Sequence, residues 1–221
     1  AEAFMSTIAV GVTEVEVARV AVAAMEDEMR IRFPDLEVQE DTFSWCQSGV
    51  DRTYVAHAPN TWRPIERNQL LSLNVFPMIA GYYHLLERSV FFGELPDTVR
   101  KPLEVQIAAH HAGIKMLRPG VRFNQIDDVI NPILESSGYL SDRTFGSGHS
   151  FGIMSQWYGR DEIGEMRPYN NRELQPNMVV SMEPMISVEN IGGFRHADMF
   201  LITADGSELL TTFDNGLLVK S

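Results

Sequence analysis

Two histidines lie in segments whose composition suits a site that moves protons. His57 occurs in the irregular segment Ala56-His57-Ala58-Pro59, and His149 follows Gly146 and Gly148. An imidazole changes its charge near neutral pH, so it can take a proton from water and return it to a leaving group. The plainer interpretations are a loop histidine bonded to a backbone carbonyl for His57, and a simple glycine-rich turn for His149.

Two glutamates, Glu87 and Glu183, are embedded among apolar neighbours. A glutamate is rarely buried without a partner. Glu87 could pair with its neighbour Arg88, or it could converge with Glu183 on one cavity. Two carboxylates in one cavity would either hold a metal ion or bind a cationic ligand, and the choice depends on the other ligands. The residue spacing leaves these alternatives open.

Helices and strands in similar number must position these side chains. Thr13 and Glu16 have the spacing of a capping box, from which apolar positions continue a helix to about Arg32. Further helices are predicted over 99–117 and from about Asn124, whose side chain can cap. Apolar runs bounded by glycine or proline predict strands at 38–44, 70–76, 89–92, 179–182 and 199–203. We therefore expect an α+β fold with a curved, mostly antiparallel sheet that carries helices on one face.

Two pairs of similar segments, in the same order in each half of the sequence, indicate an internal duplication. Gly11-Val12-Thr13 matches Gly120-Val121-Arg122, and the segment 71–78 resembles 180–185. Because both pairs of similar segments occur in the same order about half a chain apart, we expect two α+β repeats related by a pseudo-twofold axis.

The composition narrows the classes of partner. The 221 residues carry 18 Lys and Arg against 30 Asp and Glu, a net charge of −12, and such an acidic surface disfavours nucleic acid. No apolar run is long enough to cross a membrane. The single cysteine, Cys46, cannot form an internal disulfide, which is typical of a cytoplasmic protein. His110 and His111 lie on a polar helical stretch and are expected at the surface.

Several longer motifs are similar to the creatinase family. They are LSLNVFPMIAGYY at 71–83 followed by Leu86-Glu87-Arg88, RTFG at 143–146, GHSFG at 148–152, YGR at 158–160 and MVVSMEPMI at 178–186. The resemblance is collinear, covers nearly the whole chain and implies the pita-bread fold shared with aminopeptidase P, prolidase and methionine aminopeptidase. Residues 1–221 then correspond to the carboxy-terminal catalytic domain, without the amino-terminal domain of creatinases. The resemblance also implies a twofold homodimer.

The same resemblance implies a site without metal or other cofactor. Metallopeptidases of the superfamily hold two metal ions with two aspartates, a histidine and two glutamates. The aspartate positions are matched here by Asn74 and Leu85, and the last glutamate position by Ala197. Leucine and alanine cannot ligate, and a neutral amide is a poor ligand for a hard divalent ion.

Carried over residue by residue, the resemblance assigns roles to six side chains. His57 is the general acid and base, and Glu87 and Glu183 grip a guanidinium group. His149 supports the site, Arg160 faces the substrate carboxylate, and Tyr83 forms a pocket wall. The implied reaction is hydrolysis of a guanidino C–N bond in creatine or a related small compound, which gives urea and an amino acid such as sarcosine.

Two rival functions remain: a metal-dependent peptidase of the aminopeptidase P or prolidase type, and a binding relative without catalysis. The motif Phe194-Arg195-His196-Ala197-Asp198 also departs from the family pattern, which has a histidine at the position of Ala197. A shift by one residue along a strand reverses the face that a side chain occupies. We therefore do not expect His196 to replace that histidine.

Overall fold

The computed structural model describes residues 1–35, 37, 41–55, 57–152 and 164–221. The helices are α1 (Glu2–Thr7), α2 (Glu14–Arg32), α3 (Gly49–Tyr54), α4 (Asp97–Ile114), α5 (Phe123–Ser136) and a 3-10 turn (Leu140–Asp142). The strands are β1 (Phe43–Ser48), β2 (Gln69–Phe76), β3 (Met78–Ile79), β4 (Tyr82–Tyr83), β5 (Leu86–Phe92), β6 (Ser150–Phe151), β7 (Val179–Met182), β8 (Met185–Val188), β9 (Gly192–Arg195), β10 (Asp198–Ile202), β11 (Ser207–Leu209) and β12 (Leu218–Lys220).

Two four-stranded sheets form the centre of the molecule. The first has the order β1-β2-β5-β12 and the second β11-β10-β7-β6, and the pairings are antiparallel except that of β12 with β5. The sheets are joined where Glu87 and Ala197 exchange backbone hydrogen bonds of 3.1 and 2.9 Å. This bridge brings β5 next to the segment between β9 and β10.

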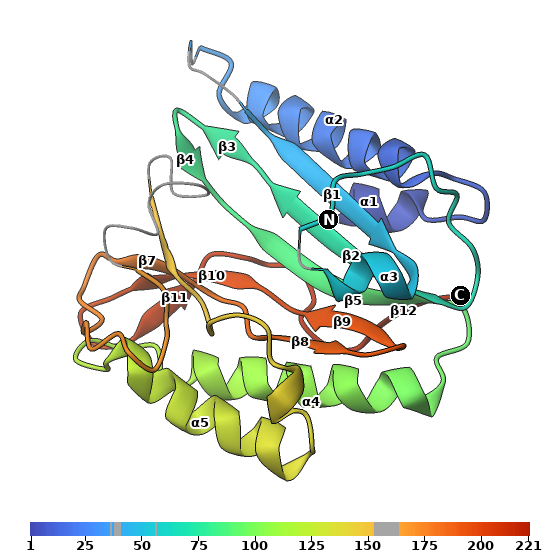
Figure 1. Ribbon diagram of the computed structural model, residues 1–221. Coiled ribbons are helices and arrows are strands. Elements are labelled where there is room, and N and C mark those ends of the chain that lie inside the picture. The colour runs from blue at the N-terminus through green and yellow to red at the C-terminus, as the bar shows by residue number, and fades with distance from the viewer. Residues whose placement is uncertain (36, 38–40, 56, 153–163) are drawn as a thin grey trace.

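The helices cover the outer sides of the two sheets. In Figure 1, α1 and α2 lie over the first sheet, whereas α4 and α5 lie beneath the second. α2 packs against β1, and α4 packs against β7, β8 and β9. The expected α+β fold with a mostly antiparallel sheet and helices on its outer surface is confirmed. Because the helices cover the outer sides, the inner surfaces of the two sheets are available to form a site.

Local sequence signals predict the helix starts well. The N–H of Thr13 donates to Glu16 Oε2 at 2.8 Å, and the N–H of Glu16 donates to Thr13 Oγ1 at 3.3 Å, which completes the capping box. Asn124, in contrast, does not cap α5. That helix starts after Arg122, whose N–H donates to Gln125 Oε1 at 2.9 Å. The first strand begins at Phe43 rather than near 38.

The expectation that His110 lies at the surface is wrong. Its side chain is fully buried where α4 packs on the second sheet, and Nε2 lies 3.4 Å from Asp198 Oδ2.

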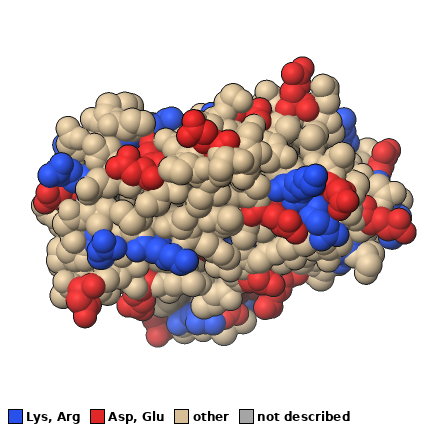
Figure 2. Space-filling model, turned by 90° about the horizontal axis from the view of Figure 1, so that it is seen from below, with Lys and Arg blue, Asp and Glu red and all other residues tan. Residues whose placement is uncertain are grey.

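The charged side chains that do reach the surface are mixed in sign. On the face seen in Figure 2, Lys and Arg are interspersed with Asp and Glu. No helix within the described residues combines the length and apolar composition that a membrane crossing requires.

Candidate active site

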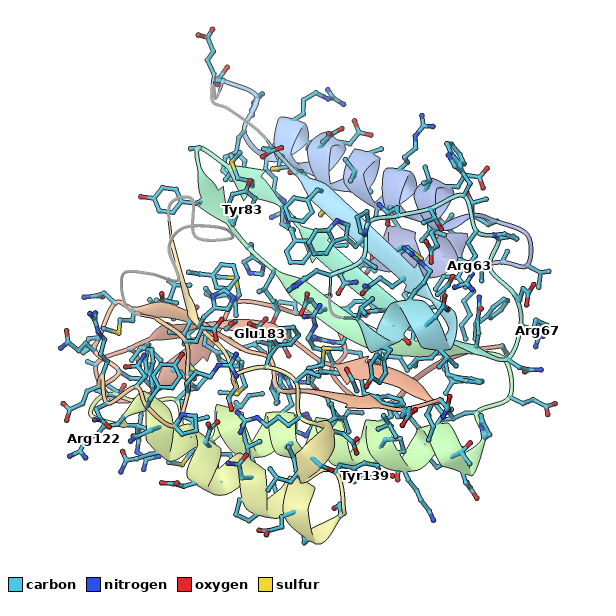
Figure 3. All side chains as sticks on the ribbon, in the orientation of Figure 1. Arg63, Arg67, Tyr83, Arg122, Tyr139 and Glu183 are labelled. Atoms are coloured by element: carbon cyan, nitrogen blue, oxygen red, sulfur yellow. The ribbon has the colours of Figure 1, made fainter. Side chains whose placement is uncertain are left out.

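A small pocket between the two sheets brings together side chains from distant segments. The residues that line it are His57, Phe145, Gly146, Gly148, Glu165, Glu183 and Arg195. Figure 3 shows Glu183 on the inner side of the second sheet, facing the first. Two of the residues expected from the sequence, His57 and Glu183, therefore share one pocket.

His57 stands at the edge of this pocket, in the segment that follows α3. It is exposed, and its ring packs against Trp45 on β1 and against Phe145, with ring centroids 5.3 and 5.8 Å apart. Aromatic walls restrict the orientation of an imidazole, while the exposed edge of the ring keeps it in exchange with water. This environment suits a group that both accepts and returns protons.

Glu183 and His149 form a close pair deeper in the site. His149 is 2% exposed, and its Nε2 lies 3.1 Å from Glu183 Oε1. Its Nδ1 lies 2.8 Å from the carbonyl oxygen of Ser150. Because a carbonyl can only accept, Nδ1 must carry a proton, which leaves Nε2 to face the carboxylate. A further proton on either group stabilises this contact, and the ring of Phe151, stacked at 4.5 Å, fixes the orientation of the imidazole.

Glu87 is buried behind the pocket rather than lining it. It is 1% exposed, and its Oε1 accepts a hydrogen bond of 2.6 Å from Arg195. The same guanidinium nitrogen lies 3.1 Å from Oδ1 of Asn74, the cross-strand neighbour of Glu87. The alternative in which the Glu87 carboxylate pairs with Arg88 is wrong, since the Arg88 guanidinium bonds Asp198 at 2.6 Å and donates to the backbone carbonyl oxygen of Glu87 at 2.8 Å.

Sequence reasoning gave no role to Arg195, although this residue links Glu87 to the pocket. It follows two glycines and a phenylalanine on β9 and is only 5% exposed. An arginine in such an apolar strand must have a buried partner, because an unpaired buried charge is strongly unfavourable. This requirement indicates from the sequence that Arg195 has a buried partner, but it does not identify Glu87, which lies 108 positions earlier in the chain.

Tyr83, another residue expected from the sequence, does not line the pocket. Tyr83 donates a hydrogen bond of 2.9 Å to Asp41 Oδ2 and packs against the ring of Phe43. Figure 3 places Tyr83 by the β3–β4 hairpin, away from Glu183. It belongs to an apolar cluster that also contains Phe151, the residue whose ring stacks on His149. Arg160 lies outside the described residues.

Comparisons with known proteins establish the family. A model of metallopeptidase family M24 matches residues 1–204. The chain belongs to this family. It is 41% identical over 218 residues to a creatinase of Bacillus sp. (strain B-0618), covering 97% of this chain and 53% of that protein. It is 28% identical to an agropine synthesis cyclase of Rhizobium rhizogenes, covering 96% of this chain and 54% of that protein. The chain thus spans about half the length of these curated relatives.

A solved structure confirms the expected pita-bread fold. An Xaa-Pro dipeptidase from Bacillus anthracis superimposes with a TM-score of 0.85 at 23% sequence identity, covering 99% of this chain and 58% of that one. At this level of identity the match shows the fold alone. The resemblance read from the motifs, to creatinases within a larger group of pita-bread enzymes, is confirmed by the two kinds of match together.

The M24 family name implies metal ions, but the residues of this site do not fit two of them. Leu85 and Ala197 are buried in one apolar cluster, where they supply no ligand atom. Asn74 presents its amide oxygen to Arg195, so a cation already occupies this part of the site. Among the described residues, no group of three or more His, Cys, Asp or Glu side chains could hold an ion. No chemical step is therefore assigned to a metal.

His196, in the short link between β9 and β10, does not line the pocket. It is fully buried, and its Nε2 lies 3.0 Å from the carbonyl oxygen of Gly216. Burial and the positive charge of Arg88 lower the pKa of His196 to about 3. Arg195 lines the pocket, whereas the contacts of His196 are with Gly216 and with the buried ring of His110. His196 cannot take the place of a histidine at position 197.

Proposed function

We propose that this chain is the catalytic part of a creatinase-like amidinohydrolase. The observation that carries the proposal is the pairing of His57 with Glu183 in one pocket of a chain that is 41% identical to a creatinase. Two carboxylates, Glu165 and Glu183, and one guanidinium, Arg195, line this pocket. Carboxylate oxygens in this lining are the acceptors that a planar guanidino group requires.

Glu183 holds the substrate in this proposal. A guanidinium carries planar N–H donors that a carboxylate accepts in charge-assisted hydrogen bonds. The Glu183 carboxylate is 13% exposed, so it reaches the pocket while remaining partly shielded from water. Glu87 acts indirectly, since its charge is bound to Arg195 within the wall of the pocket. Arg160 stays a candidate for the substrate carboxylate.

His57 moves the protons. Its neutral imidazole takes a proton from water as the water oxygen bonds to the guanidino carbon, which becomes tetrahedral. The imidazolium then gives this proton to the substituted nitrogen, and the C–N bond breaks. Creatine would yield sarcosine and protonated urea, which loses its extra proton to the solvent. The sum is one water consumed and one C–N bond cleaved.

Replacement of His57 tests this assignment. We expect His57→Ala to lower kcat by about 10²–10⁴-fold, the usual share of general acid–base catalysis, with a smaller change in KM. Glu183→Gln should impair both KM and kcat, because it removes the charge that holds the guanidinium. The assay is urea release from creatine by the full gene product. His111→Ala is the control, since His111 lines a separate groove beside Phe200.

The outcomes separate the rival functions. Creatine hydrolysis at the parent rate by His57→Ala would show that another group moves the protons, and His149 would be the next candidate. Creatine binding without urea release would favour a binding relative. Dipeptide hydrolysis that requires added divalent metal would favour a peptidase. We further propose that the protein acts in the cytoplasm as a twofold homodimer.

A further inference from the structure

One buried carboxylate outside the pocket organises the segment that carries His57. Glu14, in the first turn of α2, is fully buried. Its Oε1 accepts hydrogen bonds from Ser48 N, Ser48 Oγ and Arg52 Nε at 2.8, 2.8 and 2.7 Å. Its Oε2 accepts from Thr61 N and Thr61 Oγ1 at 3.0 and 2.8 Å. Five donor atoms, one of them on a guanidinium, therefore hold this carboxylate in a fixed position.

All of these donors belong to the two ends of one segment. Ser48 and Arg52 precede His57, and Thr61 follows it. A single carboxylate therefore fixes both ends of the segment relative to α2. The backbone adds to this attachment, because the N–H of Val15 donates to the carbonyl oxygen of Thr61 at 3.2 Å.

The attachment continues from Glu14 to the immediate neighbours of His57. The guanidinium of Arg52 also donates to the carbonyl oxygen of Pro59, two residues after His57. Asn60 is bound to β1, since its Oδ1 accepts from Cys46 N at 2.7 Å and its amide donates to Ser44 O at 2.9 Å. The ring of His57 packs on Trp45 of the same strand.

From this geometry we propose that Glu14 is a positioning residue that holds His57 over the pocket. The inference rests on the proposed role of His57 as the group that moves protons. The residues that donate hydrogen bonds to Glu14, namely Ser48, Arg52 and Thr61, do not line the pocket, so Glu14 acts through the segment between Ser48 and Thr61. Reacting groups must be held in a narrow range of positions, and small displacements reduce the rate strongly.

Glu14→Gln is the first test. The amide presents an NH₂ group to donors that now meet a carboxylate oxygen, so one end of the segment loses its acceptor. We expect kcat for creatine to fall about 10–100-fold while KM changes less than about threefold, because Glu183 lies on the other sheet. Backbone amides from Gly49 to Asn60 should exchange faster with deuterium, and the His57 ring signals should shift or broaden in NMR spectra.

A second pair of variants keeps the test decisive if Glu14→Gln does not fold. Thr61→Val keeps the shape of the side chain but removes the hydroxyl that donates to Glu14 Oε2, whereas Thr61→Ser retains it. We expect Thr61→Val to reproduce the loss of kcat and Thr61→Ser to restore most of it. Leu134→Ala is the control for a merely structural effect, because it opens a cavity in the core under α5, far from this segment.

The measurements separate failure of this inference from failure of the proposed function. If the parent protein releases no urea, the proposed function fails, and the exchange and NMR readouts still test whether Glu14 orders His57. Unchanged exchange and unchanged His57 signals in both Glu14→Gln and Thr61→Val would overturn the inference. A loss of kcat in Leu134→Ala as large as that in Glu14→Gln, measured well below the melting temperature of Leu134→Ala, would also overturn the inference.

Discussion

Acidification should destabilise this protein through two buried histidines, His110 and His196. Both are fully buried, with ring centroids 6.2 Å apart, beside the ion pair of Arg88 with Asp198. Burial, together with the positive charge of Arg88, lowers the pKa of each imidazole to about 3. His84 on the neighbouring surface also has a lowered pKa, because it is partly buried.

The direction of this pH dependence follows from which state, folded or unfolded, binds more protons. In the unfolded chain each imidazole has a pKa near 6.5, whereas in the folded chain it stays neutral until about pH 3. The unfolded state therefore gains protons first as the pH falls. The contribution of these neutral histidines to the free energy of unfolding is complete above pH 6.5 and is lost progressively between pH 6.5 and 3. From pH 7.5 to 5.5, each histidine lowers the free energy of unfolding by about 1.4 kcal/mol, and the two together by about 3 kcal/mol.

Urea unfolding at pH 7.5 and 5.5 measures this effect. The single variants His110→Gln and His196→Gln should each reduce the difference between the two pH values by about 1.4 kcal/mol, whatever their stability at pH 7.5. Leu134→Ala should be less stable at both pH values and retain the whole difference, since it removes no titrating group. A parent whose stability does not change between these pH values, or variants that keep the full difference, would refute the reasoning.

Two further predictions concern packing and assembly. Gly148→Ala should prevent folding or greatly lower Tm, because a Cβ there would lie 2.1 Å from the carbonyl oxygen of Ser181. Gly152→Ala is the matched control, because apart from its chain neighbours no atom of the described residues lies within 4 Å of a Cβ there. Thermal melting compares the two variants. Sedimentation analysis should show a twofold homodimer, and a monomer at high concentration would contradict that prediction.

Local sequence patterns were sufficient to predict an α+β fold and several of its helices and strands, whereas the pita-bread fold was implied by the family resemblance. The capping box of Thr13 and Glu16 depends on neighbours three positions apart, and both of its hydrogen bonds are present. The strands β2 and β7 were predicted because short apolar runs ended at recognisable turns. Such signals do not depend on distant contacts, which explains why they could be read directly from the sequence.

The buried polar pairs could not be read in the same way. His110 has polar neighbours along its helix, and its burial arises only when α4 packs on the second sheet beside Asp198. Glu87 was expected to face the cavity, yet its partner Arg195 comes from β9 through the bridge between the sheets. Contacts between strands so far apart in sequence depend on the tertiary arrangement, which residue spacing does not specify.

Arg195 also explains how a fold shared with metallopeptidases can offer a different kind of site. By the resemblance described above, the metallopeptidases of this superfamily have carboxylates at the positions that Asn74, Leu85 and Ala197 occupy here. A dication would here have to approach a guanidinium that is bound to Glu87 at 2.6 Å. Breaking such a buried pair costs about 3–5 kcal/mol, and the ion would still lack ligands. An organic cation needs only acceptors, and Glu183 presents them at the pocket without disturbing the Glu87–Arg195 pair.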